Sequence, residues 1–363
     1  MPYNWQQSDW PDFHYDSSVV EEDLLRFSDR AGQVTGLLRA LPEPAQTETV
    51  LQFMVAEAMK TSEIEGEALS RPDVMSSIRH RLGLDADRPI VRDRSADGAA
   101  ELMVEVRQSW AEPLDEATLF NWHRMLMANN PHVKIGAWRT HSEPMQVISG
   151  AVGKEKVHFE APPSSAVPNA MGRFLTWFNA GQNQPKATPL RAAIAHLYFE
   201  SIHPFEDGNG RMGRAIAEKA LSQGLGRPVV LSLSRTIERQ RNLYYEALQK
   251  AQRSNGITAW LSYFTTTVLA AQSDAEKQVE LTLGLTQLFD RFRDILNERQ
   301  LHTVRRMSYA DPGGFEGGMN ARKYVSLNRV SKATATRDLQ QLSKLGVFRP
   351  VGAGRSARYE LNL

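Results

Sequence analysis

The twelve residues from His203 to Arg214 concentrate more reactive side chains than any other stretch of this 363-residue chain. His203 titrates near neutral pH and can accept a proton from an attacking hydroxyl. Asp207 offers a hard oxygen ligand of the kind that Mg²⁺ takes together with phosphate and water. Arg211 and Arg214 are three apart, so on a helix they share a face and can grip successive phosphates. These residue types indicate phosphoryl or nucleotidyl transfer, which depends mainly on positioning and charge stabilisation.

The flanking sequence predicts two helices joined by a tight loop that would position these side chains. The first helix has Pro189 in its first turn and apolar residues at helical spacing, namely Leu190, Ile194, Leu197, Tyr198 and Ile202. Asp207 to Gly210 has turn composition, and Ala215 to Leu221 predicts the second helix. A loop that enters a helix N-terminus presents free N–H groups to an anion, and its glycines let a phosphate approach closely. A histidine before proline is usually structural and such a loop is usually only a turn, so the specific signal is the ordered combination.

The whole stretch matches the motif H-x-F-x-D/E-G-N-G-R-x-x-R at every defined position, and the chain therefore resembles the Fic family. The resemblance implies a mainly α fold, a Fic-type helical core with a small β-hairpin flap. It also implies Mg²⁺ and ATP as cofactor and co-substrate, and transfer of AMP to a Ser, Thr or Tyr hydroxyl of a target protein. By position, His203 resembles the general base, Phe205 an apolar anchor and Asp207 the Mg²⁺ ligand. The implied ATP-binding residues of the motif are Asp207, Gly208, Asn209, Gly210, Arg211, Met212, Gly213 and Arg214.

A second motif lies upstream, at the end of a predicted amphipathic helix. Apolar residues at helical spacing, Val50, Leu51, Phe53, Met54 and Ala58, predict a helix over residues 45–59. It runs on to Gly66, a suitable helix stop, and places Glu63 and Glu65 in a last turn where the helix dipole disfavours anions. From the residues alone, a solvated acidic helix end is the simpler interpretation.

Thr61, Glu65 and Gly66 also match S/T-x-x-x-E-G/N, which resembles the inhibitory-helix motif of regulated Fic proteins. The resemblance implies that Glu65 pairs with Arg214 and keeps this arginine from the γ-phosphate, so that ATP binds with its α-phosphate misaligned. Glu65 is thereby both an inhibitory residue and part of the ATP site. In some relatives the same glutamate assists removal of AMP, so this chain could also catalyse the reverse reaction. A second alternative is that it transfers a group other than AMP.

Two further segments resemble parts of Fic proteins. β-Branched residues on both sides of a central turn predict a hairpin, and Val157, His158, Phe159 and Glu160 would form its second strand. It is either an ordinary surface hairpin or the flap to which a target segment adds as a strand. In the helical segment 241–248, Tyr244 or Tyr245 would line an adenine pocket while the other packs in the core. Gln252 would bond the base edge, and His196 is expected in the core.

Composition excludes several classes of protein. The chain has no cysteine, which rules out disulfides, thiolate catalysis and Cys-ligated zinc. No apolar run is long enough to predict a membrane span, and the N-terminus does not read as a secretory signal, so we expect a cytoplasmic location. We expect four regions: a helical extension with the inhibitory helix (1–94), the Fic core (97–264), a helical connection (265–297) and a C-terminal domain (298–363).

The C-terminal domain differs in charge from the rest of the chain. Residues 321–363 hold nine basic and two acidic residues, about +7, whereas the whole chain carries +1. A helix ending near residue 326, another over 333–345 and a basic hairpin after Gly346 resemble a winged helix-turn-helix. Its DNA-facing residues would be Lys332, Thr334, Thr336, Arg337, Arg355 and Arg358. DNA binding and a role in dimerisation or protein docking are equally open, and a DNA-binding regulator whose core senses a nucleotide is the alternative function.

Overall fold

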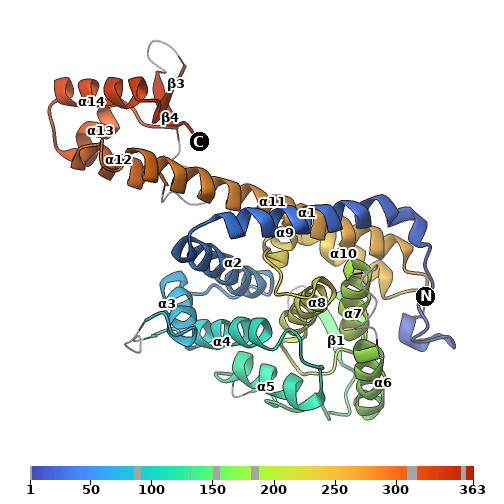
Figure 1. Ribbon diagram of the computed structural model, residues 1–363. Helices are drawn as coiled ribbons and strands as arrows, with labels where there is room; N and C mark the ends of the chain where they lie inside the picture. Colours follow the sequence, from blue (N-terminus) through green and yellow to red (C-terminus); the bar gives the residue numbers. More distant parts are fainter. Residues whose placement is uncertain are drawn as a thin grey trace. The chain divides into compact units, whose positions relative to one another are not determined.

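The computed structural model describes residues 2–85, 91–130, 132–149, 156–180, 188–308, 317–352 and 357–363. The chain divides into two compact units, which are described separately (Figure 1). Unit 1 comprises Met1–Gly36 and Gln46–Glu276, and unit 2 comprises Leu37–Ala45 and Lys277–Leu363. Helices predominate in the described residues and the only sheets there are two-stranded, which confirms the predicted mainly α fold class.

Unit 1 contains most of the helices. They are α1 (Glu21–Ala40), α2 (Glu43–Ile64), α3 (Arg71–Arg81), α4 (Arg94–Gln108), α5 (Glu116–Met127), α6 (Val167–Ala180), α7 (Thr188–Ile202), α8 (Asn209–Leu225), α9 (Leu233–Arg239) and α10 (Arg241–Ala251), followed by the first half of α11 (Thr258–Phe292). Short 3₁₀ turns at Asn4–Gln6, Ser17–Val20 and Ser164–Ala166 join them. No helix in the described ranges is both long and apolar enough to cross a bilayer.

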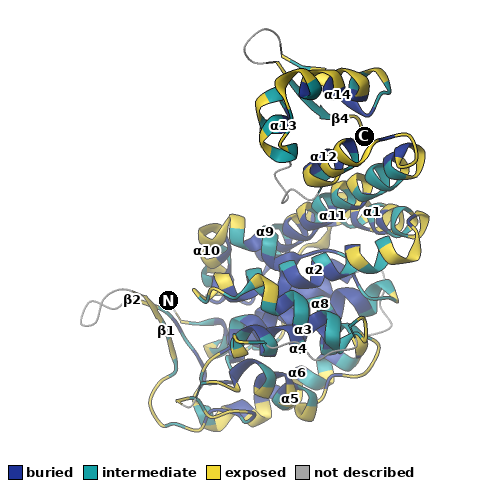
Figure 2. Ribbon diagram, turned by 90° about the vertical axis from the view of Figure 1, so that its left-hand side faces the viewer, coloured by how far each residue is buried: buried dark blue, intermediate teal, exposed yellow. Residues whose placement is uncertain are grey.

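Helices α7 and α8 form the centre of unit 1. Every residue of α7 is buried, which is the pattern of a helix surrounded by others rather than of a surface helix. Helix α8 follows after a six-residue loop and is mostly buried as well (Figure 2). It begins at Asn209, six residues earlier than the sequence predicts. Glycines lower helix propensity, which made the start of α8 look like loop, but burial of its first turns against neighbouring helices outweighs that penalty.

The predicted hairpin is present and its base is fixed by the N-terminal segment. Strands β1 (Gln146–Ser149) and β2 (Lys156–Glu160) pair antiparallel with one irregularity between Val147 and Ile148. The indole N–H of Trp5 donates to the Glu160 carbonyl at 2.7 Å, and the ring of Tyr3 packs edge-on against Phe159. The N-terminal residues therefore anchor β2, whose last residues lead into the segment before α6.

Unit 2 has the arrangement expected of a winged helix-turn-helix. Its elements are the second half of α11, α12 (Glu298–Ser308), α13 (Ala321–Asn328), α14 (Lys332–Lys344) and the hairpin of β3 (Phe348–Val351) with β4 (Arg358–Leu361). Leu339 and Leu342 of α14 lie in its apolar core. The buried carboxylate of Asp338 accepts hydrogen bonds from the Tyr324 hydroxyl at 2.9 Å and from Arg299 at 3.2 Å. This buried charge is thus paired, as burial requires.

Candidate active site

The loop between α7 and α8 is held from within by Asn209. Its amide oxygen accepts from the Phe205 N–H at 3.0 Å and its amide nitrogen donates to the Phe205 carbonyl at 2.8 Å. The Phe205 ring is fully buried and stacks on the imidazole of His123 at 4.1 Å between centroids. Phe205 is therefore an apolar anchor, as predicted. Because the Asn209 side chain is bonded to the Phe205 backbone, only the backbone N–H of Asn209 remains to bind an anion.

His123 fixes the loop from α5 and was not identified from the sequence. Burial lowers the pKa of its imidazole, which favours the neutral form. Its Nδ1 accepts from the Gly136 N–H at 2.9 Å, so the proton is on Nε2, which donates to the Asp207 carbonyl at 3.2 Å. No spacing rule connects His123 with the motif 84 residues later, and only the packing of α5 against α8 brings them together.

Arg139 is a second unexpected support of the motif. It is buried, its Nε donates to the His203 carbonyl at 2.8 Å, and its Nη2 donates to the Pro162 carbonyl at 2.6 Å. Its backbone N–H donates to the Pro204 carbonyl at 3.0 Å. His203 has a φ of +50°, a conformation that costs about 1–3 kcal/mol outside glycine and persists only where the surroundings hold it. Arg139 supplies that restraint at the candidate general base.

The N-terminus of α8 combines free N–H groups with one exposed carboxylate. Asp207 is exposed, and its oxygens accept from the Gly208 N–H at 2.6 Å and from Asn130 at 3.4 Å. Among the described residues, no group of three or more His, Asp or Glu could hold a metal. A Mg²⁺ ion at Asp207 would therefore complete its shell with phosphate oxygens and water, which is the usual behaviour of this ion.

Helix α2 ends in a Schellman motif that directs two carboxylates at α8. Gly66 has a φ of +84°, which a glycine adopts without strain. The Glu67 N–H donates to the Ser62 carbonyl and the Gly66 N–H to the Glu63 carbonyl, both at 3.0 Å. Gly66 therefore ends the helix, as predicted, and reverses the chain between Glu65 and Glu67.

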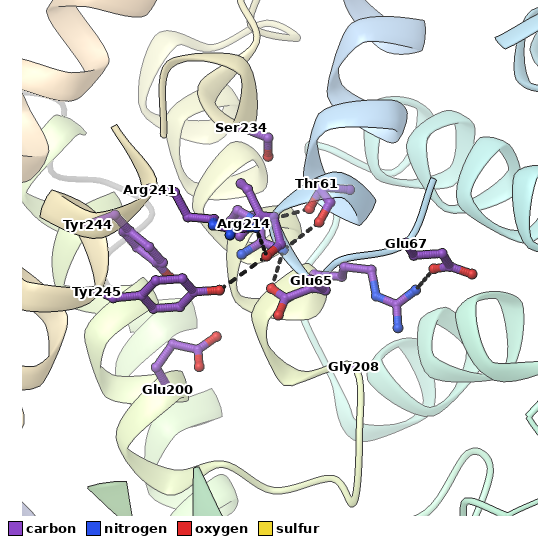
Figure 3. Close-up of polar contacts among 12 residues, drawn as sticks. Thr61, Glu65, Glu67, Glu200, Gly208, Arg214, Ser234, Arg241, Tyr244 and Tyr245 are labelled. Carbon is purple, nitrogen blue, oxygen red and sulfur yellow. Dashed lines mark hydrogen bonds and ion pairs between the residues drawn. The ribbon is translucent and has the colours of Figure 1, made fainter. Parts of the chain in front are cut away.

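The guanidinium of Arg214 is buried and bonded to the end of α2 (Figure 3). Its Nη2 lies 2.7 Å from Glu65 Oε1 and 2.9 Å from the Thr61 carbonyl, and its Nε donates to Thr61 Oγ1 at 2.7 Å. Burial disfavours the charge, but Glu65 outweighs it and holds the pKa of Arg214 above its ordinary value. A Cβ at Gly210 would lie 2.2 Å from Glu65 Oε1, so glycine there makes room for this carboxylate.

The other arginine of the motif is also paired with the segment after α2. Arg211 Nη1 lies 2.6 Å from Glu67 Oε2, and the side chains of Arg211 and Glu67 are 9% and 34% exposed. Glu67 was not identified from the sequence. The signal was present, because a glutamate on each side of a helix-ending glycine offers one carboxylate to each arginine.

Several residues predicted to bind ATP lie in the core. Met212 and Tyr244 are fully buried, and the Tyr244 hydroxyl lies 2.8 Å from His196 Nε2. The amide of Gln252 is also buried and donates to the Glu200 carbonyl at 3.2 Å, so it is not presented to a base edge. Tyr245 is the partly exposed tyrosine of the pair, and its hydroxyl donates to the Ile64 carbonyl at the end of α2 at 3.3 Å.

The predicted flap and DNA-facing residues are distributed unevenly between surface and interior. In β2, Val157 is exposed and Phe159 is buried, while His158 and Glu160 are half-buried.

On α14, Lys332, Thr336 and Arg337 are exposed, whereas the Thr334 hydroxyl contacts the capping Ser331. Arg358 pairs with Glu360 at 3.5 Å, and Arg355 lies outside the described residues.

Two segments of the chain match known protein families. Residues 113–221 match the Fic/DOC family, and residues 3–84 match a domain of unknown function, DUF4172. Protein adenylyltransferase Fic of Culex quinquefasciatus is 27% identical over 195 residues, which cover 53% of this chain and 36% of that protein. A probable protein adenylyltransferase of Aquifex aeolicus is 33% identical over 95 residues, 26% of this chain and 27% of that protein. The chain thus matches roughly a third of the length of such relatives.

Solved structures show the same fold. A Fic family protein from Desulfovibrio desulfuricans has a TM-score of 0.53 at 18% identity and covers 93% of this chain and 95% of its own. Fic-1 from C. elegans has a TM-score of 0.50 at 18% identity, with 74% of each chain covered. The fold is that of Fic proteins. The chain thus carries a match to the Fic/DOC family after an N-terminal match to DUF4172, and it has distant homology to protein adenylyltransferases.

The contact of Thr61 with Arg214 predicts a measurable loss of stability. Thr61→Val keeps the shape of the side chain but leaves the buried Nε–H of Arg214 without an acceptor, which should lower the free energy of unfolding of unit 1 by about 1–3 kcal/mol. Thr61→Ser keeps the hydroxyl and should lose less. Urea unfolding followed by tryptophan fluorescence measures both. Equal losses in the two variants would show that the hydroxyl contributes nothing.

Proposed function

We propose that this protein is a protein adenylyltransferase that transfers AMP from Mg-ATP to a Ser, Thr or Tyr hydroxyl of a target protein. The observation that carries the proposal is the state of Arg214, the last residue of the phosphate-binding motif. It is buried, and Thr61 and Glu65 of the segment before the catalytic core contact its guanidinium. Arg214 is thus a buried charge held beside a helix N-terminus and a candidate base. This is the arrangement expected of a phosphate-binding site whose access is regulated.

The residues of the loop account for each part of the reaction. His203 takes the proton of the target hydroxyl, whose oxygen attacks the α-phosphorus. The bond from the α-phosphorus to the bridging oxygen breaks, and pyrophosphate leaves. N–H groups at the start of α8 and the guanidinium of Arg211 stabilise charge on the phosphates. Asp207 would hold a Mg²⁺ ion, which would supply further neutralisation of the phosphate oxygens.

Glu65 inhibits this reaction by competing for Arg214. The carboxylate of Glu65 and the γ-phosphate of ATP are both anions that satisfy the same buried guanidinium. While Glu65 occupies it, ATP lacks the contact that aligns its α-phosphate with the attacking oxygen. Activation therefore requires that the end of α2 move or that Glu65 be displaced. The Glu65 side chain is 32% exposed, whereas the Arg214 side chain is 1% exposed. Glu65, at the end of α2, is therefore the partner that moves.

Removing the Glu65 carboxylate should activate the protein. We expect Glu65→Gly to raise AMP incorporation from labelled ATP by about tenfold or more. A tenfold change corresponds to a free-energy difference of about 1.4 kcal/mol between Glu65 bound to Arg214 and Glu65 absent. Glu63→Gly is a matched control, because Glu63 lies on the same turn but pairs with Lys60 at 2.5 Å instead of Arg214. It should leave incorporation unchanged.

The double variant Glu65→Gly/His203→Ala separates transfer from activation. It should incorporate no AMP, because the hydroxyl proton then has no acceptor. Incorporation that is equal in the presence and absence of His203 would contradict the assigned reaction. Inclusion of GTP, CTP and UTP as competitors identifies the donor, and treatment of labelled protein with the wild type tests for removal of AMP.

A separate, weaker contribution is expected from Glu67. Glu67→Gln removes the charge that faces Arg211, so ATP should bind more tightly and its KM should fall by about two- to fivefold. The effect is smaller than that of Glu65 because the arginine that Glu67 faces is less buried: the Arg211 side chain is 9% exposed, against 1% for Arg214. The KM for ATP of Glu65→Gly and Glu65→Gly/Glu67→Gln provides the comparison. A KM that is the same in both would remove Glu67 from the inhibitory contact.

Unit 2 supports DNA binding as a second candidate function. Lys332, Thr336 and Arg337 are exposed on α14, which occupies the position of a recognition helix before the hairpin. The full chain should bind duplex DNA with an affinity that falls as salt rises. Lys332→Ala/Arg337→Ala should weaken binding at least about tenfold, whereas Lys277→Ala, on α11, is the control. The absence of any salt-dependent binding in a gel-shift series would reject this function.

A further inference from the structure

The buried carboxylate of Glu200 lies beside the candidate base and takes part in no step above. Glu200 lies one turn before His203 at the end of α7, and its Oε2 is 3.6 Å from His203 Nδ1. The two side chains are 6% and 13% exposed. The separation is that of an ion pair and is longer than a hydrogen bond. Neither His203 Nδ1 nor Glu200 Oε1 has a hydrogen-bond partner among the described residues.

The geometry of the loop turns one ring nitrogen of His203 toward Glu200. His203 follows the last residue of α7 with a left-handed backbone, which Arg139 holds, and in this conformation its Nδ1 faces Glu200. A carboxylate that faces Nδ1 favours the tautomer with its proton on that nitrogen. Nε2 then carries the free lone pair, and this is the nitrogen available to a substrate hydroxyl.

The charges around Glu200 keep its carboxylate ionised. Burial disfavours the anion, but His203, His196 and Arg214 together hold its pKa below the ordinary value. Three other titratable groups face this cluster, Tyr244 and Tyr245 from α10 and Glu65 from the end of α2 (Figure 3). Glu200 is thus an anion in a position where its nearest titratable partner is the candidate base.

Helix α8 is shaped to admit this carboxylate. A Cβ at position 213 would lie 2.4 Å from Glu200 Oε1 and 3.1 Å from His196 Nδ1. A glycine inside a helix costs about 1 kcal/mol relative to alanine, so the space at Gly213 is maintained against helix propensity. The second x of the R-x-x-R motif is therefore a position at which this chain needs the absence of a side chain.

We propose that Glu200 is a positioning residue for the transfer reaction. It holds the proton of His203 on Nδ1, so that Nε2 accepts the proton of the target hydroxyl, and it stabilises the imidazolium that results. Glu200 itself neither gains nor loses a proton. The proposal rests on the proposed function for its kinetic consequence, but the Glu200–His203 pair itself is a property of the folded chain.

The kinetic test uses Glu200→Gln in the active Glu65→Gly protein. The kcat for AMP transfer should fall by about 10²-fold while the KM for ATP changes by less than about twofold. Because the carboxylate stabilises imidazolium, the acidic limb of kcat/KM should move to lower pH when the carboxylate is removed. Glu200→Asp keeps the charge and should restore part of the activity. Glu57→Gln, which alters an equally buried carboxylate on α2, should leave the acidic limb in place.

A spectroscopic test separates failure of this proposal from failure of the proposed function. The ¹⁵N shifts of His203 in the full chain should show Nδ1 protonated at high pH in the wild type, with a titration that moves to lower pH in Glu200→Gln. The His203→Gln spectrum assigns the resonances. An unchanged tautomer and titration in Glu200→Gln would overturn the role of Glu200. If the titration shifts but no variant transfers AMP, the pair stands and the proposed function fails.

Discussion

The candidate site is organised around one buried charge, the guanidinium of Arg214. A buried guanidinium is tolerable only when anions and acceptors surround it, and here these groups come from the end of α2. The Schellman turn at Gly66 delivers Glu65, and the missing side chain at Gly210 admits it. In the proposed active state a γ-phosphate replaces the carboxylate. Either anion satisfies the same charge, which is how a fully buried arginine can serve two states.

The two sides of this contact differ in how firmly they are held. The loop and α8 are fixed by Asn209, His123 and Arg139, which are all buried. The opposing carboxylates, Glu65 and Glu67, are each about a third exposed and lie just beyond the end of a helix. Segments with fewer buried contacts open at lower free energy than the core. In the proposed switch, Glu65 and Glu67 would be the movable half and the loop with α8 the preorganised half.

The sequence was sufficient for features carried by local pattern. The motif and the helix stop at Gly66 followed from residue order, since a helix end and a phosphate loop have strong local signatures. The contact between Glu65 and Arg214 followed only from the resemblance to the Fic family, because the residues alone favoured a solvated acidic helix end. Residues that act from other elements were missed: His123 and Arg139 reach the loop only through packing. Glu200 was also missed, although it lies three residues before His203, because the backbone turn that brings the two together is not encoded in their spacing. The choice between Tyr244 and Tyr245 depended on the rotation of α10, and the early start of α8 on burial, neither of which short-range spacing determines.

The central claim is that Glu65 and the γ-phosphate compete for Arg214, and nucleotide binding tests it most directly. Calorimetry with the wild type and with Glu65→Gly should show tighter ATP binding to the variant and unchanged AMP binding, because AMP has no γ-phosphate to meet the released guanidinium. Arg214→Lys in the Glu65→Gly protein should abolish the gain, since lysine lacks the planar fork of donors. An equal gain in affinity for ATP and AMP, or no gain for either, would contradict the account.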